Sequence, residues 1–264
     1  MNKQSQQLKL KPRQQEILHH LYTFRFINRL QIQTLLHHKH SSRILTWLNE
    51  LTEHEYIRRF YDKKFAPSSS AIYSLGLQGR KFLKRDSEYK EIKKELLDRV
   101  WQEHTNSKQF QDHCVFLADI YLSLISLTEK AKAKLNFYTQ TDLHGMQYMI
   151  LDNPDSYFSI ENPNGDIKRY FLDIFDDIKP SAHRQRIRQY IYYYSQSYWQ
   201  DNTKKPFPQI LLICPNEKSK NHLYYYIQKK LEHEPELLFY LSTRVKIKTL
   251  GISRESLQKV EINE

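Results

Sequence analysis

The sequence has few of the residues on which several common kinds of site depend. Only five of its 264 residues are glycine, which argues against glycine-rich loops that cradle nucleotide phosphates. Its two cysteines, Cys114 and Cys214, each lie in an apolar run, which favours buried, reduced thiols and gives no zinc-type spacing. The sequence also lacks a run of eighteen apolar residues and an apolar signal segment near Met1. We therefore expect a cytoplasmic protein without a membrane span.

The positive charge of the chain is concentrated at one end. The formal net charge is +11, and residues 1–95 hold 19 Lys and Arg against nine Asp and Glu, whereas the remainder is nearly neutral. Charge confined in this way marks an electrostatic footprint for an acidic partner. Nucleic acid is the favoured partner. An anionic membrane surface is the alternative, although the sequence has no basic amphipathic helix with an exposed apolar face.

Residues 1–85 predict a winged helix-turn-helix domain. Pro12 suits the first turn of one helix, and Asn28 with Gln31 has the form of a capping box for a second. A third helix is expected after an N-cap at Ser41-Ser42, with an apolar stripe at i, i+3, i+4 and i+7. The stripe consists of Ile44, Trp47, Leu48 and Leu51. Two strands around a polar loop and a closing helix follow, at residues 56–61, 71–75 and 76–83.

In such a domain the third helix enters the major groove and the hairpin, or wing, lies against the backbone. Arg reads guanine and Asn reads adenine by paired hydrogen bonds, while basic side chains on the wing hold phosphates. The candidates for contact with double-stranded DNA are Ser41, Ser42, Arg43, Thr46, Asn49, Arg58, Arg59, Lys63 and Lys64. Taken singly, each charge could be an ordinary solvated residue. As a set on this scaffold they favour DNA over a protein-binding adaptor.

Residues 86–105 predict a charged helical connector, either a linker or a dimerisation helix, which leaves a homodimer open. Residues 106–264 then change to a nearly neutral, aromatic, strand-rich composition. The expected order is helix, three strands, helix and strand, at residues 110–124, 134–140, 147–161, 168–175, 182–199 and 209–214. A helix at residues 217–231 and a strand at 245–250 follow. This αβββαβ order, within an α+β chain, is that of restriction-endonuclease-like domains.

Endonucleases of this kind need carboxylates that converge on a divalent cation. Their signature is Pro-Asp before a hairpin strand and acid-x-Lys on the next strand. Asp155, after Pro154, and Asp173 occupy the two acidic places and could share Mg²⁺. Phe175 stands where the lysine belongs, so we expect a degenerate domain with neither cleavage nor cofactor. A Mg²⁺-dependent DNA nuclease or nickase that uses Asp155 and Asp173 is the alternative.

Three other patterns have both a structural and a functional interpretation. The histidines at positions 37, 38, 40 and 54 favour a surface cluster over a metal site, because neighbouring residues on a helix point in different directions. Gln189 and Tyr193 have a spacing seen beside some nuclease sites, but core packing explains most aromatic residues of that helix. The arginines of the same helix could hold a nucleic-acid strand or be solvated charges; they are Arg184, Arg186 and Arg188.

At these motifs the chain resembles the replication-relaxation family, bacterial proteins associated with plasmids and mobile elements. The matching segments are residues 12–18, 41–51, 73–83, 104, 154–155 and 171–173. The resemblance implies a winged-helix DNA-binding domain joined to a nuclease-like domain, with a role in plasmid replication, copy control or relaxation of DNA for transfer. Replication or mobilisation proteins are then further partners. Family members tend to carry acid-x-acid where this chain has Asp173-x-Phe175, a departure that counts against activity of the second domain.

Overall fold

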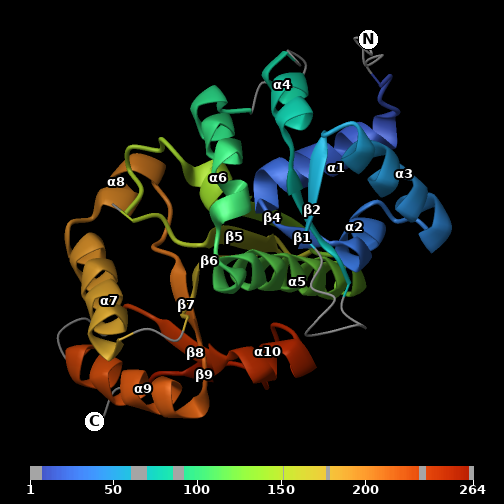
Figure 1. Cartoon of the computed structure of the whole chain (residues 1–264). Helices are drawn as coiled ribbons and strands as arrows, with labels where there is room; N and C mark the ends of the chain where they lie inside the picture. Colours follow the sequence, from blue (N-terminus) through green and yellow to red (C-terminus); the bar gives the residue numbers. More distant parts are fainter. Residues whose placement is uncertain are drawn as a thin grey trace, which may run out of the picture. The chain divides into compact units, whose positions relative to one another are not determined.

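The computed structural model describes residues 8–60, 70–85, 92–150, 152–176, 179–231 and 236–261. The chain divides into two compact units, Met1–Ala118 and Asp119–Glu264, and each contains both helices and strands (Figure 1). The division falls inside helix α5 (Lys108–Lys130), whereas the sequence predicts a first domain that ends at residue 85 and a second that begins at residue 106.

The first unit has the element order of a winged helix-turn-helix. Its helices and strands up to the wing are α1 (Pro12–Phe24), β1 (Ile27–Asn28), α2 (Arg29–Leu35), α3 (Ser41–Glu53), β2 (Ile57–Phe60) and β3 (Ile72–Leu75). The three strands form one antiparallel sheet in the order β1-β3-β2. Helix α4 (Leu77–Arg85) follows directly after β3.

Local sequence signals place the first three helices. Pro12 lies in the first turn of α1, where its missing N–H costs nothing. Asn28 and Gln31 form the predicted capping box, with reciprocal hydrogen bonds of 2.9 Å. The apolar stripe of α3 is buried, as its spacing predicts. The predicted serine N-cap of α3 is wrong. His40 is the N-cap residue and makes no side-chain capping bond, and Ser41 already belongs to the helix.

The described part of the predicted connector is not a free linker helix. It consists of two 3₁₀ segments, Lys94–Trp101 and Glu103–Thr105, that belong to the first unit. Glu103 is only 2% exposed and receives two hydrogen bonds from Arg25, at 3.0 and 3.2 Å. Asn106 donates a further hydrogen bond of 2.7 Å to the same carboxylate. These charge-assisted hydrogen bonds to the buried Glu103 carboxylate hold the second 3₁₀ segment in place.

The second unit is built on a six-stranded sheet. Its strands are β4 (Lys134–Thr139), β5 (Ser156–Glu161), β6 (Ile167–Ile174), β7 (Gln209–Cys214), β8 (Phe239–Thr243) and β9 (Gln258–Lys259), in that spatial order. β4, β5 and β6 are antiparallel neighbours, while β6, β7 and β8 run parallel. The expected turn at residues 162–166 joins β5 to β6, with Gly165 at a φ of +85°.

Two predicted strands of this unit are wrong. Residues 147–150 form turns instead of a strand that continues into β5. Residues 245–250 lie in helix α10 (Arg244–Leu250), where the Thr243 side chain caps the Lys246 N–H. The alternation of apolar and polar residues from Val245 to Lys248 suggests a strand. In the structure, however, Val245 is 70% exposed, so it does not lie on a buried face. The pairing partner of β7 is β8, which the sequence reading missed.

Helices cover both faces of this sheet (Figure 1). One face packs on α7 (Pro180–Ser195), α8 (Tyr198–Thr203) and α9 (Glu217–Leu231), which share one apolar cluster with inward-facing strand residues. The predicted helix 182–199 is divided between α7 and α8 by Ser197, whose φ is +55°. Phe171 on β6 and Phe175, directly after β6, belong to the cluster on this face, and Asp173 lies between them. The acid therefore points at α7.

Within the described residues, α5 is the one helix long and apolar enough to cross a membrane by length and composition. A core helix passes the same test. The first turns of α5 pack on the first unit, where Phe110 contacts Phe26 and the Val115 carbonyl accepts a 2.7 Å hydrogen bond from Gln31. The first turns of α5 are therefore packed inside the first unit.

Candidate nucleic-acid interface and acidic pair

The outer face of α3 carries the residues proposed to touch DNA. Ser42, Thr46 and Asn49 follow one another at spacings of four and three, which places them in a row on one side of the helix. Ser41 and Arg43 flank this row, and all five side chains are exposed. The helix is anchored from behind by its buried stripe. The result is a rigid helix that presents hydroxyl, amide and guanidinium groups outward.

Arg59 on β2 joins the wing to this helix. Its guanidinium donates a 3.1 Å hydrogen bond to Oδ1 of Asn49. Arg59 also pairs across the sheet with Tyr73, close to Arg29. Burial raises the pKa of Tyr73, although both arginines oppose the shift, so the phenol stays neutral beside them. Two cations and an amide therefore gather at the junction of wing and helix. The sequence analysis did not predict Arg29 as part of this group.

Arg58 does not share that surface. Adjacent residues of a strand point to opposite faces, so Arg58 turns away from Arg59. Its guanidinium donates a hydrogen bond of 3.4 Å to the Val100 carbonyl and lies 3.1 Å from Nδ1 of His104. Arg58 therefore holds the 3₁₀ segments in this structure, and its contact with phosphate stays a prediction. Lys63 and Lys64 lie outside the described residues.

The acidic residues of the second unit do come together at the end of the β5–β6 hairpin. Asp155 immediately precedes β5, and its N–H donates a 3.3 Å hydrogen bond to Oδ1 of Asp173. Its own carboxylate accepts from the Ile174 N–H at 2.7 Å and from Gln140 at 3.2 Å. Both acids are almost fully buried, at 9% and 6% exposure. This is the side-by-side arrangement that the sequence predicts.

A guanidinium is bound to Asp173 of this pair. Arg186 on α7 donates to Asp173 through Nε at 2.6 Å and Nη2 at 3.3 Å. Tyr190, one turn later, donates to Oδ2 at 2.8 Å. With the Asp155 N–H, four donors reach the two oxygens of Asp173, which matches the acceptor capacity of a carboxylate. A metal ion would have to displace Arg186 to bind there.

Protonation of this cluster follows from its burial. Burial, together with the charge of Asp173, raises the pKa of Tyr190 well above its ordinary value, so the phenol remains a hydrogen-bond donor. Burial alone would lower the pKa of Arg186, but Tyr190 and Asp173 outweigh it and raise that pKa. Arg186 is therefore a permanent cation. Among the described residues no group of three or more potential metal-ligating side chains exists.

The position of the missing lysine is filled by packing. Phe175 stacks on the His183 ring, with centroids 4.4 Å apart and planes 2° from parallel. Asp176 forms an ion pair of 2.6 Å with Arg244. Arg186, the cation bound to this pair of acids, donates to Asp173. The contacts between Asp173 and Arg186 brace the sheet against α7.

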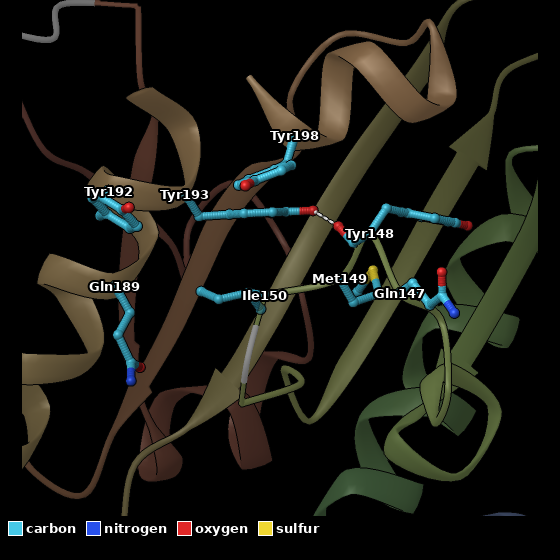
Figure 2. Close-up of a pocket in the computed structure, with 8 residues that line it drawn as sticks. All are labelled: Gln147, Tyr148, Met149, Ile150, Gln189, Tyr192, Tyr193 and Tyr198. Atoms are coloured by element: carbon cyan, nitrogen blue, oxygen red, sulfur yellow. Dashed lines mark hydrogen bonds between the residues drawn. The ribbon is translucent and has the colours of Figure 1, made fainter. Parts of the chain in front are cut away.

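A pocket of about 410 Å³ lies beside this cluster (Figure 2). Its walls come from the turn before β5 and from α7 and α8, and its lining residues are Gln147, Tyr148, Met149, Ile150, Gln189, Tyr192, Tyr193 and Tyr198. Tyr193 crosses the pocket and donates its hydroxyl to the Tyr148 carbonyl. Gln189 and Tyr193, noted for their spacing, therefore line the same cavity.

The model of one protein family, described as Replication-relaxation, matches residues 18–210 of the chain. This span covers both units and exceeds half of the sequence. The chain belongs to the replication-relaxation family. No curated protein matches it significantly.

Solved structures similar to this replication-relaxation protein cover about half of its length. The transcriptional regulator Tm0710 from Thermotoga maritima has 15% identity and a TM-score of 0.27, covering 46% of this chain and 77% of its own. A variant of ZitR from Lactococcus lactis has 20% identity and a TM-score of 0.27, covering 49% and 81%. A second ZitR variant, in complex with DNA, gives the same values.

Sequence reasoning on this family member missed the partner of its acidic pair. Arg186 lies 13 residues after Asp173, on α7 instead of β6. The sequence alone does not distinguish it from Arg184 and Arg188. One signal was available. Arg186 precedes Tyr190 by four residues, on the edge of the stripe that Ile187 and Tyr190 bury, whereas Arg188 falls on the exposed side.

Proposed function

We propose that this replication-relaxation protein is a sequence-specific double-stranded DNA-binding protein that acts through its first unit. The observation that carries the proposal is the exposed row on α3, joined to the wing by the bond between Arg59 and Asn49. In a winged helix-turn-helix this helix enters the major groove. The process served is control of plasmid or mobile-element replication or transfer, in the cytoplasm, alone or with replication or mobilisation proteins.

The contacts divide into two kinds. Asn49, Thr46 and Ser42 would reach base edges, because they lie along the centre of the exposed face. Arg43, Arg59 and Arg29 flank them and would hold phosphates, which adds affinity without sequence choice. Lys11 is a weaker candidate, since it lies 3.8 Å from Glu50 and is partly neutralised there.

The second unit, in the same proposal, is a restriction-endonuclease-like domain that has lost catalysis. Its αβββαβ order and the paired Asp155 and Asp173 support the relationship. Arg186 in the cation position and Phe175 in the lysine position support the loss. It needs no Mg²⁺ on this view. The remaining role is structural, as a platform for a second copy or another protein.

The test is a titration of the full chain with duplex DNA. A pool of random-sequence duplexes is enriched by repeated binding, and the selected duplex is titrated at several salt concentrations. Arg59→Ala should weaken binding to selected and unselected duplexes alike and reduce the slope of log K against log salt by roughly one. Asn49→Ala should instead relax the sequence preference, by roughly 5- to 100-fold at one base pair.

Lys108→Ala is the matched control. Lys108 is an exposed cation of the same unit, paired with Asp112 on α5 and remote in sequence from wing and helix. Its removal should leave both affinity and salt slope unchanged. Equal affinity of wild type and Arg59→Ala, or equal losses in Arg59→Ala and Lys108→Ala, would remove α3 and the wing as the DNA-binding surface.

A further inference from the structure

The pocket beside the acidic pair has an unusual lining. Four of its eight lining side chains are tyrosines, two are glutamines and none is charged. Tyr192 and Tyr198 are 65% and 54% exposed, so both rings are accessible from solvent. An uncharged aromatic lining suits a ligand that is itself flat and neutral.

The walls are held in fixed positions. Burial raises the pKa of Tyr193, whose neutral hydroxyl donates to the Tyr148 carbonyl across the cavity (Figure 2). Both polar atoms of the Gln189 amide are hydrogen-bonded. Arg186 donates to its oxygen at 3.3 Å, and its nitrogen donates to Asp152 at 3.0 Å. Among the described residues Asp152 is the acceptor bound to this nitrogen, so its second amide hydrogen can serve a ligand. Gln147 on the opposite wall adds an exposed amide.

These features together match the needs of one ligand chemistry. A nucleobase has two π-faces for stacking on tyrosine rings and an edge of donors and acceptors for amides. The volume of about 410 Å³ lies within the range of ligand pockets and leaves space for a sugar. A phosphate attached to that sugar would remain outside the uncharged lining.

We propose that this pocket binds an unstacked nucleobase, with Tyr192 and Tyr198 as the stacking surfaces and Gln189 as the polar contact. The base would come from a single-stranded segment or from a free nucleoside; the chemistry of recognition is the same. The inference rests on the second unit alone. It stands independently of duplex binding by α3.

The test uses the full chain and two probes. Fluorescence anisotropy follows a labelled twelve-nucleotide single strand, and calorimetry follows adenosine and thymidine. Wild type should bind at least one probe, and Tyr192→Ala/Tyr198→Ala should weaken that binding about tenfold or more. Tyr192→Phe/Tyr198→Phe should retain it, because stacking needs the ring and not the hydroxyl. Tyr225→Ala is the matched control, an equally exposed tyrosine on α9, and should behave as wild type.

The pattern of results identifies the source of the base. Tight binding of the single strand, with weak binding of an abasic strand of equal length, assigns the pocket to nucleic acid. Binding of nucleosides without the single strand assigns it to a free ligand. Failure of wild type to bind either probe, or equal binding by Tyr192→Ala/Tyr198→Ala, overturns the proposal. Duplex affinity measured in parallel separates this outcome from failure of the α3 surface, since the tyrosine variant should keep it.

Discussion

Removal of the Arg186 side chain tests the account of the acidic pair most directly. Arg186→Ala would leave Asp173 ionised in a site where it is only 6% exposed, with Asp155 beside it. It would also delete two hydrogen bonds to Asp173 and one each to Gln189, the Tyr190 hydroxyl and the Asp152 carbonyl. Loss of one partner from a buried ion pair costs about 3–5 kcal/mol. We expect the free energy of unfolding of the second unit to fall by that amount.

The assay is urea unfolding of the full chain, followed by far-ultraviolet circular dichroism. Arg188→Ala is the control, since Arg188 is an exposed arginine on the same helix and donates only a 3.3 Å bond to the Tyr226 hydroxyl. It should change stability by less than about 0.5 kcal/mol. Arg186→Met combined with Asp173→Leu should recover most of the loss, because it removes both charges and refills the site with apolar atoms.

A small effect of Arg186→Ala would contradict this account. A loss below about 1 kcal/mol at neutral pH would show that Arg186 is not the partner that stabilises the buried Asp173.

The remaining expectations concern metal and pH. Supercoiled plasmid incubated with Mg²⁺ or Mn²⁺ should not be nicked by wild type, because Arg186 fills the cation position; nicking that disappears in Asp173→Asn would restore the nuclease alternative. Burial lowers the pKa of His20 from 6.5 to about 4, so the unfolded chain binds this proton more tightly. The stability contributed by His20 is complete above pH 6.5 and falls by roughly 2 kcal/mol between pH 7 and 5. Urea unfolding should show a weaker pH dependence in His20→Gln, and an identical dependence would contradict the assignment.

The sequence predicted best where a signal is local. The apolar stripe of α3, the capping box at Asn28 and the turn around Gly165 each depend on residues within a few positions of one another. The pairing of Asp155 with Asp173 also followed, since a hairpin fixes which residues lie opposite. These features gave the winged helix-turn-helix and the acidic pair without knowledge of distant contacts.

The sequence failed where distant contacts decide. The alternation at residues 245–248 suggests a strand, but a strand must pair with a neighbouring strand. The position beside β7 is occupied by β8. In the sequence Arg58 and Arg59 are equivalent wing cations. Only the contacts of Arg58 with Val100 and His104 distinguish the two. Charged residues 86–105 predict a linker or dimerisation helix, because Arg25, the partner of the buried Glu103, lies 78 residues earlier in the chain. Periodicity carries none of this information.

The guanidinium at the end of the hairpin has one more consequence. A divalent ion must be acquired from solution, whereas Arg186 is supplied by the chain itself and keeps its charge at every physiological pH. The sheet and α7 can therefore dock as soon as both have been synthesised, whatever the local concentration of free magnesium. Chelating agents should leave this brace intact.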